Sequence, residues 1–199
     1  MIRIRRLFAG GSAANEQLTA LVASVLLLLL AIEGATLLQI QSLLTVHAFV
    51  GMLLIPLVAL KLASTGWRML RYYRRAEEYV RLGPPHVVLR VLVAPVVVLS
   101  TIVLFATGVA LLLLDQTHGT IVGLHKASFI VWVGAMSVHV LTRATKLPRV
   151  LRHRLSGAAL RVAVVSGAVL AGVLLAVATL PAADRLQDRA SSNLGFDDG

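Results

Sequence analysis

Three histidines are the first candidates for chemistry, because each lies in or at the start of an apolar stretch of the chain. His125 and His139 stand fourteen residues apart in one stretch, and His47 lies near the start of another. A side chain that can ionise or bind a metal is costly at membrane depth, so its presence there indicates a function or a polar partner. Neutral imidazole nitrogens are common ligands of metal ions and of haem iron.

Helix geometry relates the two histidines of the same stretch. Fourteen residues make nearly four helical turns, so His125 and His139 would point to almost the same face. With a rise of about 1.5 Å per residue, they would lie about 21 Å apart along the helix axis. The spacing therefore predicts two levels at which one helix could contribute an imidazole.

The composition indicates a membrane protein. The chain has 199 residues, of which 58% are hydrophobic, and its mean hydropathy is +0.86. The absence of cysteine excludes disulfides, thiolate metal sites, cysteine-bound iron–sulfur clusters and covalent c-type haem. The net charge of +10 does not indicate nucleic acid, because the basic residues lie in loops between apolar blocks. Topology and anionic lipid headgroups explain such charges better.

The apolar residues form five blocks, and the last four each reach the ~20 residues that cross a bilayer. The first block reaches that length only if it includes Glu33. A cleavable signal peptide is the rival interpretation of the N-terminus, but the apolar run starts late and no clean cleavage site follows it. The blocks cover about residues 18–32 (extending to 38), 43–63, 87–114, 121–141 and 160–180.

We therefore expect an all-α fold, an integral membrane helical bundle of five transmembrane helices over residues 18–181. Residues 1–17 would form a basic cytoplasmic N-terminus. Residues 182–199 would form a polar extracytoplasmic tail that is disordered or ordered by a partner.

Basic residues predict the orientation, because they concentrate in the N-terminus and in alternate loops. Lys and Arg mark the cytoplasmic side of a membrane protein. The N-terminus should lie inside and the C-terminus outside, in a multi-pass protein of the plasma membrane. The basic residues that carry this argument are Arg3, Arg5, Arg6, Arg68, Arg71, Arg74, Arg75, Arg81, Arg143, Lys146, Arg149, Arg152 and Arg154.

This topology predicts a site near the outer face. Blocks 43–63 and 121–141 run in the same direction, so His47 and His125 should lie at matched depth. Two imidazoles on neighbouring helices can hold a haem iron from opposite sides. Gly51, one turn below His47, and Gly108, at a comparable depth, would let a flat macrocycle approach. Alternatively, both histidines only form hydrogen bonds with neighbouring helices.

The inner level lacks a second histidine on block 43–63. His139 on block 121–141 corresponds to Lys61 on block 43–63, since both lie fourteen residues after the outer histidines. Lysine is an uncommon haem ligand, and a contact with a propionate or a lipid phosphate is the more ordinary role. His86 and His153 on the inner side, and His118 in an outer loop, are expected to be solvated.

Two further features have open interpretations. Glu33 is either a proton-carrying or quinone-binding group, or only the polar end of a short first span. Trp132, seven residues after His125, either walls a haem pocket or packs in the core. The aromatic residues Trp67, Tyr72, Tyr73 and Tyr79 are expected to form a belt at the inner membrane interface.

The motifs resemble those of a known family. His47-Ala-Phe-Val-Gly51 resembles the His-x-x-x-Gly signature of bacterial membrane cytochromes b, and Leu124-His125 with His139 downstream resembles their later histidine helix. Residues 20–145 as a whole resemble the cytochrome b/b6 (b-561-like) superfamily. The stretch 61–85, with Tyr72-Tyr73 and Gly83-Pro84-Pro85, is similar to an actinobacterial branch of that group.

The resemblance implies b-type haem and electron transfer between a quinone pool and a partner oxidoreductase. It implies His47, His125 and His139 as ligand candidates. Many di-haem relatives have four axial histidines, and only three can be placed here, so we expect one haem and leave a second open. The sole enzymatic extension would be a quinone-linked oxidoreductase.

Two alternatives from other classes remain. One is a haem-free membrane scaffold or assembly subunit, in which the histidines serve as interhelical hydrogen-bond donors. The other is a small proton-coupled transporter with Glu33, His47, Lys61 and His139 as its polar pathway. The absence of a convincing inverted repeat weighs against the transporter.

Overall fold

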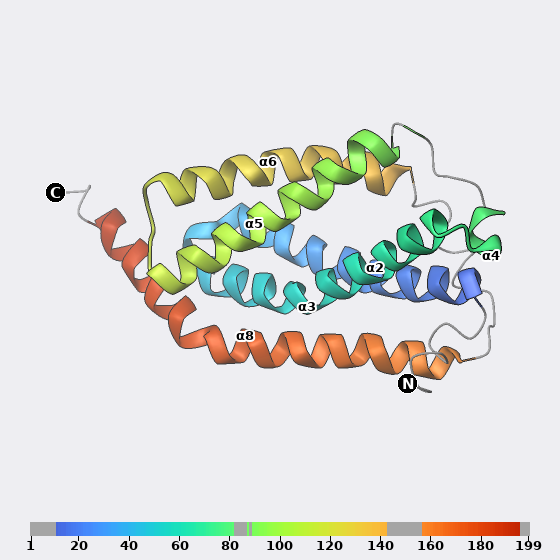
Figure 1. The fold of residues 1–199 in the computed structure, drawn as a ribbon. Coiled ribbons are helices and arrows are strands. Elements are labelled where there is room, and N and C mark those ends of the chain that lie inside the picture. Colours follow the sequence, from blue (N-terminus) through green and yellow to red (C-terminus); the bar gives the residue numbers. More distant parts are fainter. Residues whose placement is uncertain (1–10, 82–86, 88, 143–156, 196–199) are drawn as a thin grey trace.

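The computed structural model describes residues 11–81, 87, 89–142 and 157–195. The predictions for His86, His153 and the basic residues of 1–10 and 143–156 lie outside the described residues. All described elements are helical, which confirms the all-α bundle (Figure 1). The long helices are α2 (Gly11–Thr36), α3 (Ile40–Tyr73), α5 (Ala94–Leu114), α6 (Thr120–Leu141) and α8 (Ala158–Gly195); the short elements are η1 (Leu37–Gln39), α4 (Glu77–Val80) and the π-helical turn η2 (Leu89–Val93).

Four helical stretches of the described chain are long and apolar enough to cross a membrane. They are Gly11–Tyr73, Val91–Leu114, Thr120–Leu141 and Ala158–Ser192. The first has 63 residues and contains α2, η1 and α3. The described part of the chain therefore has five long helices but four continuous span candidates, because the expected first and second spans form one helical stretch through the turn at η1, where the chain bends and Leu43 has non-helical backbone angles.

The surface of the bundle is strongly apolar. Many large hydrophobic side chains are exposed, among them Ile130 and Leu141 of α6 and Leu28 of α2. On α6 the partly buried residues recur on one helical face, and the other faces expose apolar side chains. Water-soluble monomers rarely expose contiguous apolar surface on this scale. A lipid environment accounts for these faces.

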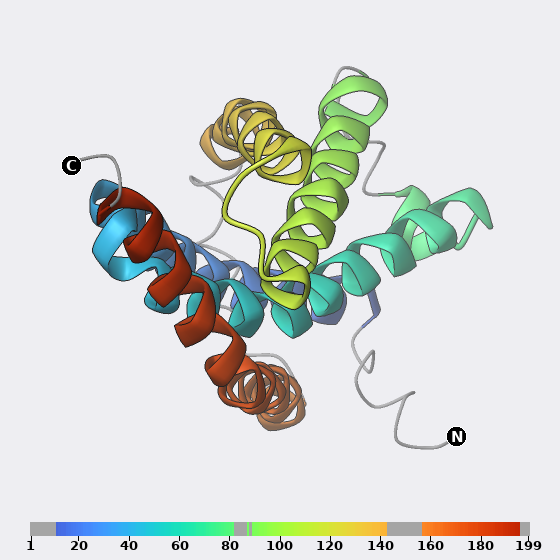
Figure 2. The same ribbon diagram turned by 90° about the vertical axis from the view of Figure 1, so that its left-hand side faces the viewer.

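Two helical hairpins set the arrangement. In the first, α2 and α3 are antiparallel, because Asn15 contacts Ser64 at one end and Glu33 contacts His47 at the other. In the second, α5 and α6 are antiparallel. α6 and α8 lie on opposite sides of the layer formed by α2 and α3 (Figure 2). As a result α3 is the central helix, between α2, α8 and the second hairpin.

α8 packs closely along α3. A Cβ atom on Gly172 of α8 would collide with the backbone carbonyl of Leu53, so the absence of a side chain permits this approach. The core between α2, α3 and α8 is aliphatic and includes Val22, Leu54 and Leu57, each at most 2% exposed. These contacts hold α3 in place over most of its length.

The segment after residue 181 was expected to be disordered or ordered by a partner, and its described part, residues 182–195, is helical and packs on this chain itself. α8 continues through Pro181 and the polar residues after it as far as Gly195. Gln187 accepts hydrogen bonds from the backbone N–H groups of Leu44 (2.8 Å) and Thr45 (3.3 Å), and Arg189 forms an ion pair with Asp115. Open amides at the start of α3 therefore order the helix that polar composition alone suggested was loose.

Candidate functional site

His47 and His125, which were expected at matched depth on two helices, lie close together. His47 comes from α3 and His125 from α6, and their ring centroids are 6.5 Å apart. The two ring planes are nearly perpendicular, with an interplanar angle of 89°. We call His47 and His125 the histidine pair.

Hydrogen bonds define the tautomer of His47. Its Nδ1 lies 3.1 Å from Oε1 of Glu33 and 3.0 Å from Oγ1 of Thr36. The Thr36 hydroxyl donates its proton to the carbonyl of Glu33 at 2.6 Å, so it can only accept from the imidazole. The network therefore assigns the proton of His47 to Nδ1 and leaves the lone pair on Nε2.

The same assignment holds for His125 by a different route. Its Nδ1 lies 3.2 Å from the backbone carbonyl of Leu104 and 3.0 Å from Oγ1 of Thr107. A carbonyl can only accept, so Nδ1 carries the proton here too. Within the described part of the chain, the Nε2 atoms of the histidine pair have no hydrogen-bond partner. Both imidazoles thus present an available lone pair.

The glycines make room for the site's own side chains. A Cβ on Gly108 of α5 would lie 3.1 Å from Cε1 of His125, which is tighter than most contacts of this kind. A Cβ on Gly51 would lie 3.6 Å from Oε1 of Glu33, an ordinary van der Waals distance. Gly108 therefore lets the His125 ring sit against α5, and Gly51 faces the carboxyl group that contacts His47. These two distances do not test the predicted role of Gly51 and Gly108 beside a macrocycle.

The ring separation fits a metal held between two imidazoles. Metal–imidazole bonds of about 2 Å on opposite sides would place the two ring centres about 6 Å apart. Among the described residues, no cluster of three or more His, Cys, Asp or Glu side chains could hold a metal ion. A site supplied by protein atoms alone is therefore short of ligands. Haem iron fits better, because the macrocycle supplies four nitrogens and the protein needs to add two.

Trp132 contacts α5. Its indole Nε1–H donates to Oγ1 of Thr101 at 2.9 Å, and the side chain is partly buried. This hydrogen bond ties α6 to α5 two turns below His125 and helps to fix the face on which His125 lies. The expectation that Trp132 either packs in the core or walls a pocket is compatible with this position.

Lys61 points to α2. Its Nζ donates to the backbone carbonyl of Thr19 at 2.9 Å. Around it, Asn15 donates to the carbonyl of Ser64 at 3.1 Å and the Thr19 hydroxyl donates to Oγ of Ser64 at 3.1 Å. We call Asn15, Thr19, Lys61 and Ser64 the inner polar cluster. Its geometry explains the lysine through helix–helix hydrogen bonding, without reference to His139.

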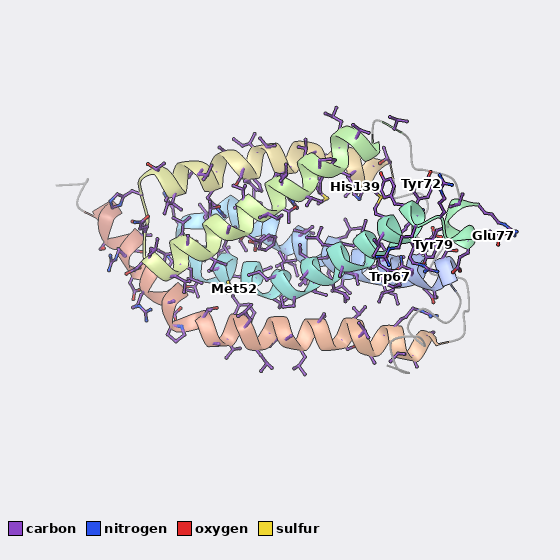
Figure 3. The ribbon with its side chains drawn as sticks, viewed as in Figure 1. Met52, Trp67, Tyr72, Glu77, Tyr79 and His139 are labelled. Carbon is purple, nitrogen blue, oxygen red and sulfur yellow. The ribbon has the colours of Figure 1, made fainter. Side chains whose placement is uncertain are left out.

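His139 is partly buried near the end of α6. Figure 3 shows it at the same end of the bundle as Tyr72 and Tyr79. His118 is exposed in the turn before α6, as expected, with its Nδ1 3.3 Å from Oγ1 of Thr117. The structure thus brings together His47 and His125 and places His139 at the other end.

The aromatic residues gather at the end of α3 and in α4. Tyr72 and Tyr73 have ring centroids 5.6 Å apart, and the guanidinium of Arg71 lies 5.9 Å from the ring centre of Tyr79. Burial, followed by the nearby charge of Glu78, raises the pKa of the Tyr79 phenol. An open cavity of about 590 Å³ lies beside them, and it includes none of the predicted site residues; its lining is Tyr72, Tyr73, Arg75, Glu77, Val80 and Arg81.

Sequence reasoning missed the partners of the histidine pair. Thr36 and Thr107 are threonines of apolar helices, where a hydroxyl usually bonds to its own helix. Such a residue carries no sequence signal for a contact with a histidine of another helix. Glu33 is conspicuous in the sequence as an acidic residue of an apolar block, but its contact with His47 depends on how the turn at η1 folds. Fourteen residues separate Glu33 from His47, and in a tight antiparallel hairpin that separation could have indicated the contact.

No family model, curated protein or solved structure matches this chain.

Proposed function

We propose that this chain is a membrane b-type cytochrome that transfers electrons by means of haem held between His47 and His125. It would resemble the cytochrome b/b6 (b-561-like) superfamily and would act between a quinone pool and a partner oxidoreductase. The haem would supply reversible one-electron chemistry at its iron. The protein would bind the iron, orient its ligands and exclude water.

The histidine pair is the observation that carries this proposal. Two imidazoles from separate helices lie 6.5 Å apart, and both have their protons on Nδ1 and their lone pairs on Nε2. Metal-binding histidines commonly donate their second ring N–H to a carboxylate or a backbone carbonyl. Here Glu33 and Leu104 supply one of each.

The membrane topology is part of the proposal. We infer five spans, with α2 and α3 as separate crossings, the N-terminus inside and the C-terminus outside in the plasma membrane. The antiparallel contacts between α2 and α3 support two crossings, and the basic loop after α3 supports an inner location for that end. The histidine pair would then lie near the outer face, where an extracytoplasmic redox partner could approach.

Single-cysteine labelling tests the topology, because the natural chain contains no cysteine. A membrane-impermeant thiol reagent added to intact cells should label Thr117→Cys and leave Glu78→Cys unlabelled until the cells are lysed. Labelling of both positions from outside would contradict the five-span arrangement.

A reduced-minus-oxidised spectrum tests the function. The protein, expressed with added haem precursor and purified in detergent, should show sharp α and Soret bands after reduction with dithionite. Persistent absence of these bands would overturn the proposal and favour a haem-free scaffold. Absence of colour with an ion flux that depends on Glu33 would favour the transporter.

The ring angle provides a second readout. If haem bound to His47 and His125 with their ring planes as they are here, the low-spin ferric EPR spectrum should be highly anisotropic with one large g value. The 89° angle between His47 and His125 leads to this expectation. A rhombic spectrum typical of parallel imidazoles would mean that the rings do not keep this arrangement when haem binds.

A further inference from the structure

Glu33 is the most unusual side chain near the histidine pair. It lies in the last turn of α2, and its side chain is 16% exposed. One carboxyl oxygen, Oε1, contacts Nδ1 of His47, and the other, Oε2, is buried without a hydrogen-bond partner in the described part of the chain. Burial of an acidic group within an apolar bundle is costly, so its position beside His47 indicates a role.

The two members of the histidine pair differ in the groups that accept their Nδ1 protons. His47 faces a carboxyl group, together with the neutral hydroxyl of Thr36. His125 faces two neutral acceptors, the carbonyl of Leu104 and the hydroxyl of Thr107. A carboxylate acceptor makes an imidazole more electron-rich at its opposite nitrogen than a neutral acceptor does.

We propose that Glu33 is a positioning residue that fixes His47 for iron binding and, through its carboxylate, lowers the reduction potential of the bound haem. This inference rests on the proposed function. A more basic ligand and a nearby negative charge both favour the ferric over the ferrous state. The apolar surroundings strengthen the effect, because charge interactions are weakly screened there. His47, not His125, would then set the potential.

The test is a potentiometric titration of the α band at one fixed pH. Glu33→Gln keeps the size of the side chain and an oxygen that can accept from Nδ1, and it removes the charge. It should retain haem at the wild-type ratio and show a higher midpoint potential. Asp115→Asn is the matched control, because it removes an acidic charge that pairs with Arg189. Its midpoint should remain that of the wild type.

Each outcome has a distinct meaning. A wild-type protein without haem defeats the proposed function and this inference with it. A haem-loaded Glu33→Gln variant with the wild-type midpoint defeats this inference alone. An equal rise of the midpoint potential in Asp115→Asn would mean that loss of any acidic charge raises the potential. That result would also overturn this inference.

If Glu33→Gln does not fold, Glu33→Asp replaces it. Aspartate keeps the charge, but its carboxyl group is withdrawn from Nδ1 by one methylene. The variant should bind haem with about tenfold lower affinity, in the range usual for loss of such a supporting contact. Its midpoint should lie above that of the wild type. Unchanged affinity and midpoint would overturn the positioning role.

Discussion

The two ends of the bundle, outer and inner in the proposed topology, share one sequence pattern and differ in the contacts that their polar side chains make. At the outer end, the rings of His47 of α3 and His125 of α6 lie close together, with their centroids 6.5 Å apart. Fourteen residues further along the same helices stand Lys61 and His139. Lys61 donates to a carbonyl of α2 and belongs to the inner polar cluster. Equal spacing on two helices thus does not guarantee equal sites.

α2 explains the difference, because it contacts α3 at both ends. Near the outer end it supplies Glu33 and Thr36, which are acceptors for the Nδ1 proton of His47. Near the other end it supplies the carbonyl of Thr19, which accepts from Lys61. The contacts from Glu33 and Thr36 hold the imidazole of His47 and leave its Nε2 atom available. The contact from Thr19 engages the ammonium group of Lys61 itself. The contacts from α2 therefore leave His47 able to bind a ligand and engage Lys61 in a hydrogen bond.

The largest effect should follow removal of either member of the histidine pair. His47→Ala and His125→Ala should each abolish the haem spectrum, because one axial imidazole leaves the iron without its second protein ligand. The measurement is the haem-to-protein ratio of purified protein. His118→Ala is the control, since His118 is an exposed histidine of the turn before α6. It should keep the full ratio.

The inner end should respond differently to the same substitution. His139→Ala and Lys61→Met should leave the haem-to-protein ratio at its wild-type value if the outer site alone binds haem. Loss of half of the haem in either variant would establish a second site and remove the distinction between the two ends. Persistence of haem in both His47→Ala and His125→Ala would locate the cofactor elsewhere.

A smaller effect should follow the addition of one methyl group beside His125. In Gly108→Ala the new Cβ would lie 3.1 Å from the imidazole, so the ring or α5 must shift. Overpacking of this kind costs about 1 kcal/mol, or roughly a fivefold loss of haem affinity. Gly51→Ala is the matched control, because its Cβ would meet Glu33 at an ordinary 3.6 Å. Haem titration of the apo-proteins measures both.

Equal affinities for Gly108→Ala and the wild type would show that His125 does not depend on close packing against α5. A larger loss in Gly51→Ala than in Gly108→Ala would instead identify the α3 side of the site as the more constrained one. Either result would indicate that packing against α5 is not the main constraint on the site and that the hairpin of α2 and α3 matters more.

The sequence predicted the helices because their signal is strong and local. Long apolar blocks permit few structures other than helices in a membrane. Each of the five expected segments corresponds to one long helix of the described chain, although α2, α3 and α8 extend beyond the expected ends and the first two form one span candidate. The matched depth of His47 and His125 could also be predicted, since it needs only helix direction and residue count. In the structure their ring centroids lie 6.5 Å apart.

The remaining features depend on tertiary contacts that periodicity does not encode. The tail after Pro181 is polar, and its helix is held by Gln187 at the start of α3 and by Arg189 at Asp115. The acceptors of the histidine pair come from α2 and α5, and no local pattern around His47 or His125 specifies them. The stretch Gly11–Tyr73 likewise contains two antiparallel helices, which meet at a bend around η1 and Leu43.

The smallest effect should follow loss of a hydrogen bond at the inner end. Asn15 is 1% exposed, and its side-chain amide donates to the carbonyl of Ser64. Asn15→Ala removes this link between α2 and α3 and should lower stability by about 1 kcal/mol, the usual size for one hydrogen bond between helices in a membrane. Denaturant titration in detergent micelles measures the change.

The haem-to-protein ratio and the midpoint potential of Asn15→Ala should remain those of the wild type, because the inner polar cluster holds the hairpin and contributes nothing to the histidine pair. Thr36→Val is the outer counterpart. It removes one acceptor of His47 from the same helix and should change the haem spectrum as well as stability. If Asn15→Ala altered haem binding as much as Thr36→Val, α2 would act as a single rigid support, and the two ends of the bundle would not be independent.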